Sequence, residues 1–205
     1  MNDDIELPLE KKLSDNAKSK IWSVKIKSHV QLGLLNFLKK IFSGNQKNIP
    51  TWCNSVYTWK AAEAVGVYNL KGVSYPVTEK RRLGTWHANR QIVTVGSLVR
   101  GKGYRELINI AAKLEHWHFI VIGFPKDPSF VIELEQIISE YRLKNITLLV
   151  DASEAIKSRE LKNSSVYLHL KVNEPFGISV VEALEKGCIP IVPNSGGPAE
   201  TVSIR

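Results

Sequence analysis

The chain has 205 residues, of which 43% are hydrophobic and 23% charged, and its formal net charge is +8. This length accommodates one full domain and part of a second, and the composition excludes a disordered, a collagen-like and a disulfide-rich protein. The two cysteines, Cys53 and Cys188, stand in unrelated contexts, which favours a reducing, cytoplasmic location over a disulfide framework or a zinc site. No apolar run approaches the roughly 20 residues of a membrane span, and the acidic N-terminus is unlike that of a signal peptide.

The positive charge is concentrated in the first half of the chain. Residues 1–100 contain 16 Lys and Arg against 7 Asp and Glu, whereas residues 101–205 contain 12 against 13. A basic half joined to a nearly neutral half indicates two tasks, or parts of two domains. Nucleic-acid binding is not indicated, because no recognition motif or aromatic platform accompanies the charge.

Residues 1–76 are expected to form a mainly helical remnant of one domain. Apolar residues recur at three- and four-residue spacing from Ile21 to Phe42, between flanking lysines, which predicts an amphipathic helix. This helix either lies on an anionic membrane surface through its lysines or packs in the domain with the lysine face in solvent. A second helix is expected near 57–65 and a short strand at 72–75.

Residues 77–90 are interpreted as a linker, since they contain three consecutive basic residues and no apolar period. From residue 91 to residue 205, short apolar runs alternate with amphipathic stretches, which is typical of a parallel sheet. The runs are apolar on both faces, so we expect a Rossmann-like α/β fold with helices on both faces of the sheet and ligands at the carboxyl ends of the strands. The expected strands are 92–95, 119–122, 146–150, 166–170 and 189–192, and the expected helices are 103–116, 129–142, 153–162 and 178–187.

The turn after the first of these strands, Gly96 to Gly103, is the first candidate for an anion site. Its glycines allow backbone N–H groups to approach a phosphate, and Arg100 and Lys102 add cationic charge. The alternative is a tight strand-to-helix turn whose charges are solvated. A P-loop is disfavoured, because Gly103 occupies the position at which a hydroxyl would hold Mg²⁺.

The turn after the fourth strand contains two carboxylates eight residues apart, Glu174 in the loop and Glu182 in the following helix. Gly177 permits close backbone approach at the start of that helix, where N–H groups would face a phosphate. A carboxylate among apolar neighbours is costly without a partner, and the vicinal hydroxyls of a ribose or sugar would provide one for Glu182. Alternatively, Glu182 is a surface residue and Glu174 caps the helix.

A third glycine-rich turn, Pro193 to Glu200, follows the fifth strand, and Pro198 suits the first turn of a helix. The carboxyl ends of parallel strands meet at one edge of the sheet. The three turns together therefore predict a single cleft, which is a more specific prediction than any one of them supports.

These residues resemble the family 4 retaining glycosyltransferases, which have the GT-B fold. The segment from Glu174-Pro175-Phe176-Gly177 to Glu182 is similar to the E-x7-E motif of that family, and the similarity continues through 187–192 and 195–200. The turn that contains Gly96 and Lys102 resembles the family's donor-phosphate loop. The resemblance covers residues 50–205, with 50–76 similar to the end of the N-terminal domain.

The resemblance implies a role for each matching position. Glu182 would bind the ribose, Glu174 would contact the donor sugar near its reacting carbon, and Lys102 would neutralise the diphosphate leaving group without a metal ion. Glu174 and Lys102 are thus the expected catalytic residues. The expected donor-binding positions are Gly96, Ser97, Arg100, Gly177, Ile178, Ser179 and Glu182.

One position departs from the family pattern. The family commonly has arginine where this chain has Ser97, so half of the expected phosphate clamp is replaced. Arg100, three residues further on, is the candidate substitute.

The resemblance also implies a second Rossmann-like domain that faces the first across the reaction cleft. Only the end of that acceptor-side domain is recognised here, and the donor-binding domain stops before its last expected elements, so the chain is expected to be a truncated GT-B half. One hypothesis is a retaining hexosyltransferase, or its donor-binding part, that uses a UDP- or GDP-sugar and a glycan or lipid-linked acceptor. The other is a catalytically inactive homologue that binds a nucleotide sugar. No metal or other cofactor is expected, and peripheral membrane contact would use residues 21–42.

Overall fold

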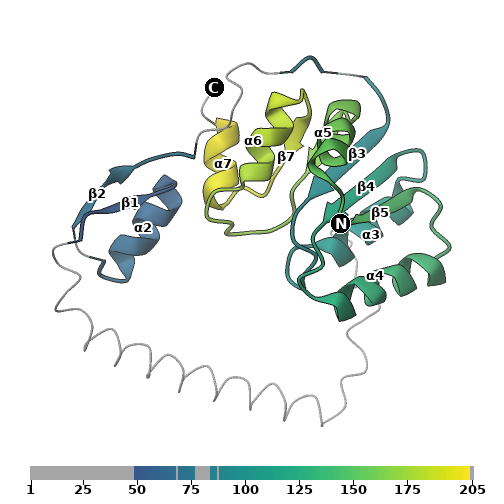
Figure 1. Ribbon diagram of the computed structural model, residues 1–205, viewed down its shortest axis with the longest axis horizontal. Coiled ribbons are helices and arrows are strands. Elements are labelled where there is room, and N and C mark those ends of the chain that lie inside the picture. The colour runs from purple at the N-terminus through teal and green to yellow at the C-terminus, as the bar shows by residue number, and fades with distance from the viewer. Residues whose placement is uncertain (1–48, 68, 77–83, 87, 204–205) are drawn as a thin grey trace, which may run out of the picture. The chain divides into compact units, whose positions relative to one another are not determined.

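The computed structural model describes residues 49–67, 69–76, 84–86 and 88–203 (Figure 1). The amphipathic helix predicted at 21–42 lies outside these residues, as do residues 77–83 and 87 of the predicted linker. Residues 50–205 form one unit by their contacts. No helix in the described part of the chain is long and apolar enough to cross a membrane.

The first described elements form a small β–α–β unit. β1 (Thr51–Cys53) and β2 (Leu70–Val73) are parallel neighbours, and α2 (Val56–Ala64) connects them. α2 begins at a capping box, in which the Ser55 hydroxyl accepts from the Thr58 N–H and the Thr58 hydroxyl accepts from the Ser55 N–H. The sequence predicts α2 and, two residues later than observed, β2. It does not predict β1, because three residues carry almost no periodic pattern.

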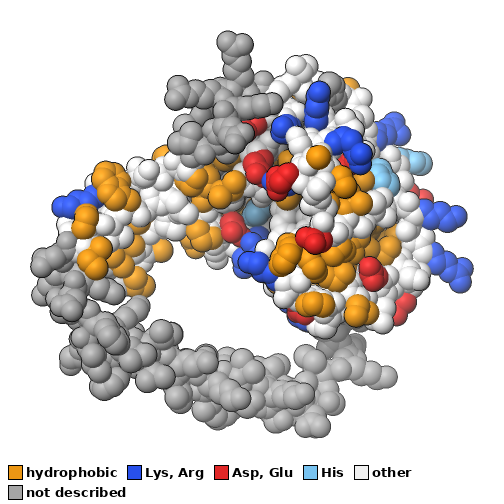
Figure 2. Space-filling view, viewed as in Figure 1, with side chains coloured by type: hydrophobic (Ala, Val, Ile, Leu, Met, Phe, Trp, Pro, Cys, Tyr) orange, Lys and Arg blue, Asp and Glu red, His pale blue; other side chains and the backbone are white. Residues whose placement is uncertain are grey.

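The β–α–β unit has little core of its own. α2 contains no buried residue, Trp52 and Val65 are 61% and 59% exposed, and Figure 2 shows apolar side chains gathered on this part of the chain. A two-stranded sheet is marginally stable by itself. The unit therefore depends on contacts with the following domain.

Two contacts supply that support. The Glu200 carboxylate accepts the N–H groups of Val56 and Tyr57 at the start of α2 and also the Tyr75 hydroxyl, so an acidic side chain neutralises the positive end of the helix dipole. The hydroxyl of Ser55, which is fully buried, donates to the carbonyl oxygen of Pro175 at 2.6 Å. The β–α–β unit is thereby joined to the loop that precedes α6.

The larger domain is a five-stranded parallel sheet with helices on both faces, which confirms the predicted fold class. The strand order is β5-β4-β3-β6-β7. The first strand of this domain, β3, is therefore central; β4 and β5 follow on one side of it, and the chain then crosses over to β6 and β7 on the other side. The strands are β3 (Gln91–Val95), β4 (His118–Gly123), β5 (Ile146–Val150), β6 (Val166–Leu168) and β7 (Ile189–Ile191). The helices are α3 (Tyr104–Lys113), α4 (Pro128–Glu140), α5 (Glu154–Asn163), α6 (Ile178–Glu185) and α7 (Gly196–Ser203).

The alternation of side chains along the strands divides the core into two layers. In β3, Ile92 packs with the buried residues of α3 and α4, whereas Val93 packs with those of α5 and α6. In β4, Phe119 belongs to the first layer and Ile120 to the second. Figure 1 shows the two pairs of helices on opposite sides of the sheet. The unbroken apolar runs in the sequence follow from this arrangement, because both faces of each central strand are covered.

Candidate functional site

A cavity lies where the strand order reverses, between the carboxyl ends of β3 and β6. Its volume is about 320 Å³. In open parallel sheets this switch point is where the loops diverge and leave a crevice for a ligand. Seven of the nine site residues predicted from the sequence line the cavity: Gly96, Ser97, Lys102, Glu174, Gly177, Ile178 and Ser179.

The loop from β3 to α3 is shaped by glycines in the left-handed region. Gly103, the N-cap of α3, has φ +84°, and a Cβ on it would lie 2.4 Å from the Cβ of Leu170. The loop can therefore approach the end of β6 closely only because residue 103 has no side chain. This close approach brings the neighbouring Lys102 into the cavity.

Lys102 and Glu174 meet inside the cavity. The Nζ atom of Lys102 lies 2.6 Å from Oε2 of Glu174, and the two side chains are 27% and 21% exposed. These residues are 72 positions apart in sequence, and the carboxyl ends of β3 and β6 bring them together at one edge of the sheet. Both side chains have access to the cavity. Each can therefore release the other and bind a ligand instead, the ammonium binding an anionic group and the carboxylate binding hydroxyl groups.

The loop that carries Glu174 is held by the start of α7. The Gly197 N–H donates to the Glu174 carbonyl oxygen at 2.9 Å. Gly196 has φ +74°, and a Cβ on it would lie 2.4 Å from that same oxygen. The third glycine-rich turn thus does not line the cavity but supports the loop that does.

The N-terminus of α6 lies at the same cavity. Gly177 is its N-cap in the left-handed conformation, with φ +84°, and uses no side-chain cap. The first N–H groups of a helix have no intrahelical acceptors, and here residues Gly177, Ile178 and Ser179 all line the cavity. The Ser179 hydroxyl is fixed by Tyr167, whose hydroxyl lies 2.7 Å from Ser179 Oγ and 3.2 Å from the Val95 carbonyl oxygen. Burial raises the pKa of Tyr167 well above its ordinary value, so this link stays neutral.

Glu182 lies on α6 but not among the residues that line the cavity. Its Oε1 is 3.1 Å from Nζ of Lys157 on α5, which also contacts Glu154 at 2.8 Å. Burial lowers the pKa of Lys157, but the hydrogen bonds to Glu154 and Glu182 outweigh it and leave that pKa raised. Glu182 is therefore neither a solvated surface residue nor unpaired, and Lys157 is a partner that the sequence pattern does not reveal.

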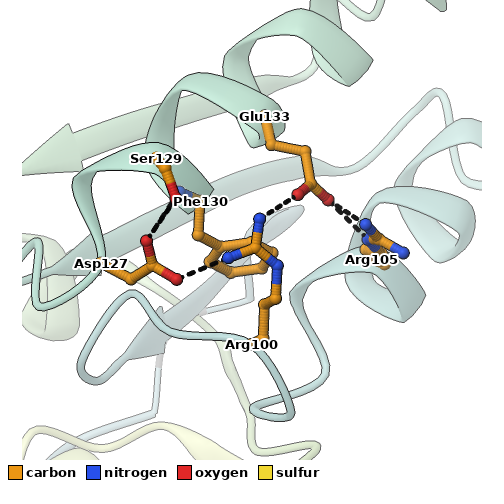
Figure 3. Close-up of polar contacts among 6 residues, drawn as sticks. All are labelled: Arg100, Arg105, Asp127, Ser129, Phe130 and Glu133. Carbon is orange, nitrogen blue, oxygen red and sulfur yellow. Dashed lines mark hydrogen bonds and ion pairs between the residues drawn. The ribbon is translucent and has the colours of Figure 1, made fainter. Parts of the chain in front are cut away.

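Arg100 does not reach the cavity. Its guanidinium donates to Asp127 at 2.6 Å and to Glu133 at 2.7 Å, and its carbon lies 5.2 Å from the centre of the Phe130 ring (Figure 3). Arg105 binds the same Glu133 carboxylate. Arg100 is thus engaged by acidic groups next to and on α4, and the structure does not place it as a substitute for the arginine missing at Ser97.

The acidic groups that hold Arg100 are themselves stabilised as carboxylates. Ser129 and then the Phe130 N–H and Arg100 lower the pKa of Asp127, against an opposing effect of burial. Arg105 and then Arg100 lower the pKa of Glu133, again against burial. The cluster keeps its charges at neutral pH. Of the two cationic residues predicted for the site, Lys102 lines the cavity and Arg100 does not, and Lys171, which the sequence-based prediction omitted, lines it as well.

His169 lines the cavity and is absent from the sequence-based prediction. It follows β6 directly, and the predicted strand 166–170 included it as part of an apolar run. A polar ring at the carboxyl end of a buried strand is the signal that would have identified it. Among the described residues, no three His, Cys, Asp or Glu side chains cluster so as to hold a metal ion.

Comparison with known proteins agrees with this architecture. Residues 78–204 match the family described as Glycosyl transferases group 1, so the chain belongs to that family. The five-stranded domain has the fold of a GT-B half: sucrose-phosphate synthase from Thermosynechococcus elongatus superposes with a TM-score of 0.63 at 19% identity, over 77% of this chain and 44% of that one.

Two curated relatives are similar in sequence. A GDP-Man:Man(3)GlcNAc(2)-PP-Dol alpha-1,2-mannosyltransferase of Dictyostelium discoideum is 33% identical over 87 residues, which cover 40% of this chain and 17% of the relative. The phosphatidylinositol N-acetylglucosaminyltransferase GPI3 subunit of Saccharomyces cerevisiae is 32% identical over 116 residues, which cover 54% of this chain and 25% of the relative. The matched segments thus span a quarter or less of these relatives.

Proposed function

We propose that this chain binds the donor of a retaining glycosyl transfer, a nucleoside diphosphate sugar, in the cavity between β3 and β6. The observation that carries the proposal is the Lys102–Glu174 pair, 2.6 Å apart at the switch point of a glycosyltransferase-family domain. One cation and one carboxylate with shared access to a cavity match the two parts of such a donor, its diphosphate and its sugar hydroxyls.

Lys102 is proposed to bind the diphosphate, which becomes the leaving group when the bond to the anomeric carbon breaks. Negative charge builds up on that oxygen in the transition state, and a fixed ammonium in a partly buried site stabilises it. The N–H groups at the start of α6 add to this effect. Because Asp127 and Glu133 hold Arg100, Lys102 supplies this charge in place of the family's arginine, and Lys171 is a second cation in the lining of the cavity.

Glu174 is proposed to change partners when the donor binds. In the structure its carboxylate holds the Lys102 ammonium. A diphosphate that takes over the ammonium frees the carboxylate to accept hydrogen bonds from the donor sugar near its reacting carbon. Glu182 is proposed to bind the ribose. Since Glu182 does not line the cavity, the ribose would extend beyond it toward Glu182, where its hydroxyls would share the carboxylate with Lys157.

The matched segments span a quarter or less of the two curated relatives, so the transfer of the sugar to an acceptor is likewise a proposal. UDP and GDP sugars are the proposed donors, with a glycan or a lipid-linked acceptor, a choice supported by the names of the mannosyltransferase and the GPI3 subunit. Reaction without a metal ion is part of the proposal, as are a cytoplasmic location and peripheral membrane contact through residues 21–42. Residues 1–76 are proposed to derive from the acceptor-side domain.

Calorimetric titration with a panel of UDP- and GDP-sugars tests donor binding. We expect one donor to bind, with Kd unchanged by EDTA, and Lys102→Met to weaken it about 10- to 100-fold because a charge-assisted hydrogen bond is lost. Arg100→Gln is the matched control, since it removes a cation from the neighbouring cluster outside the cavity, and it should change Kd less than twofold.

Two results would overturn this proposal. One is a folded chain that binds none of the donors. The other is an equal loss of affinity in the Lys102 and Arg100 variants, which would show that the effect is one of overall charge. Mg²⁺-dependent ATP binding that is lost in Lys102→Met but kept in Glu182→Gln would instead support a P-loop protein.

A further inference from the structure

The sheet holds the backbone of His169 beside the cavity between β3 and β6. Its backbone N–H donates to the Ile191 carbonyl oxygen at 2.9 Å, which continues the pairing of β6 with β7 by one residue. Its ring lies nearly parallel to that of Tyr167, with 6.5 Å between the ring centres. The side chain lines the same cavity as Lys102 and Glu174.

The ring has an unsatisfied nitrogen. His169 is 8% exposed, and within the described part of the chain its Nε2 atom has no hydrogen-bond partner. Buried polar atoms are almost always paired, since an unpaired one costs the energy of its lost hydration. No other buried side-chain nitrogen or oxygen of the described residues is left in this state.

The other ring nitrogen determines what Nε2 can do. Hydrogen bonding with the Lys171 backbone acts to raise the pKa of His169, which is the effect of a carbonyl oxygen that accepts from a ring N–H. Because Nε2 has no partner, this bond uses Nδ1. A neutral ring with its proton on Nδ1 presents a lone pair at Nε2, which is an acceptor.

The surroundings keep the ring neutral. Burial is the largest effect on His169 and lowers its pKa, and the Lys102 ammonium lowers it further, while the Glu174 carboxylate and the Lys171 carbonyl act in the opposite direction. The net pKa is lowered. Nε2 therefore remains an acceptor at neutral pH.

Given the proposed donor binding, we infer that Nε2 of His169 accepts a hydrogen bond from a hydroxyl group of the donor sugar. The diphosphate of a nucleotide sugar carries no proton to donate at neutral pH, whereas each hydroxyl group of the sugar can donate one. Glu174, the other group proposed to contact the sugar, is close enough for its charge to act on the ring. The sugar end of the donor is thereby assigned to the part of the cavity between Glu174 and β6.

His169 is then a donor-binding residue that contributes to the affinity for the sugar and not to the affinity for the nucleotide. The competing explanation is that the ring only fills space against Tyr167. The two explanations predict different effects of replacing the ring. If the ring only fills space, its loss changes the affinities for the nucleoside diphosphate and for the nucleotide sugar alike. If it accepts from a sugar hydroxyl, its loss weakens only the binding of the nucleotide sugar.

The test compares two variants with the wild type. His169→Leu keeps the bulk and removes the acceptor, and His169→Gln keeps an acceptor near the Nε2 position. For each we would measure Kd for the best-binding nucleotide sugar and for its free nucleoside diphosphate. We expect His169→Leu to weaken the nucleotide sugar about tenfold, to leave the nucleoside diphosphate within twofold, and His169→Gln to recover part of the loss.

Deoxy analogues of the donor sugar identify the hydroxyl. In the wild type, removal of the hydroxyl that His169 binds should weaken the nucleotide sugar. In His169→Leu that penalty should disappear, while the penalties for removing other hydroxyls remain. Unchanged ratios of the two dissociation constants in both variants, or a deoxy penalty that persists in His169→Leu, would overturn the inference and leave donor binding intact. A wild-type chain that binds no nucleotide sugar would overturn both.

A measurement on the wild type removes any dependence on how the variants fold. In the chain labelled with ¹⁵N-histidine, the Nε2 resonance of His169 should shift more with the nucleotide sugar than with the nucleoside diphosphate, because the diphosphate alone changes only the charges of Lys102 and Glu174 near the ring. The same shift with both ligands, or with neither while calorimetry shows binding, would contradict a bond from the sugar.

Discussion

Gly101 and Gly103 form a matched pair for testing how the cavity is built. Both have a left-handed backbone, with φ +80° and +84°, and both lie in the loop from β3 to α3. A Cβ on Gly101 meets nothing within 4 Å, whereas a Cβ on Gly103 would lie 2.4 Å from the Leu170 Cβ. The substitutions Gly101→Ala and Gly103→Ala therefore share one conformational cost and differ in one steric contact.

The magnitudes follow from these two terms. A left-handed alanine costs about 1–2 kcal/mol, so Gly101→Ala should lower the free energy of unfolding by about that amount. Gly103→Ala adds the cost of overpacking, about 1–3 kcal/mol, because the opposing atom is a Cβ that cannot turn away without moving the backbone. Gly103→Ala should also weaken donor binding, since the displaced neighbours, Lys102 and Leu170, both line the cavity.

Urea unfolding followed by circular dichroism gives the two free energies, and calorimetry gives the two dissociation constants. We expect Gly103→Ala to be the less stable variant by about 1–3 kcal/mol and to be the one with impaired binding. Equal destabilisation, or equal donor affinity in two folded variants, would show that the loop does not approach Leu170 as described.

Three further predictions concern single groups. Glu200→Ala should lower the free energy of unfolding by about 0.5–2 kcal/mol, because α2 loses the group that caps its N-terminus. Amide exchange should become faster in residues 51–73 while β4 stays protected, and equally faster exchange throughout the chain would contradict this local role. The folded pKa of His169 lies below that of the unfolded chain, about 6.5, so the unfolded state binds more protons and wild-type stability should fall as the pH drops below that value; an equal fall in His169→Gln would refute this. Burial raises the pKa of the Cys188 thiol to about 11, so in a Cys53→Ser background iodoacetamide at pH 8 should label Cys188 only after unfolding, and rapid labelling of the folded chain would count against its burial.

The order and type of the elements from β3 to β7 are predictable because the physical cause is local. Central strands covered on both faces need unbroken apolar runs, and the surface helices between them need one apolar stripe. β1 escapes prediction, since its three residues and its pairing with β2 depend on a contact about 20 residues away in the chain. Where elements are short, tertiary contacts decide, and a pattern search has too few positions to detect them.

The candidate site shows the same division. Lys102 and Glu174 follow strands whose carboxyl ends must meet at one edge, so their approach is predictable from topology. Arg100 has the same kind of neighbours in sequence but turns away, because Asp127 and Glu133 stand within its reach. Glu182 is likewise engaged by Lys157, which belongs to another helix. Side-chain partners across elements depend on geometry that the spacing of residues along the chain does not encode.

The most direct test of the account is the position of the diphosphate in a crystal of the chain grown with the nucleotide sugar that binds best. We expect a diphosphate oxygen within hydrogen-bond distance of the Lys102 Nζ atom, with the Glu174 carboxylate turned from Lys102 toward the sugar. A diphosphate bound at Arg100 and Arg105, with the Lys102–Glu174 pair still closed, would contradict it.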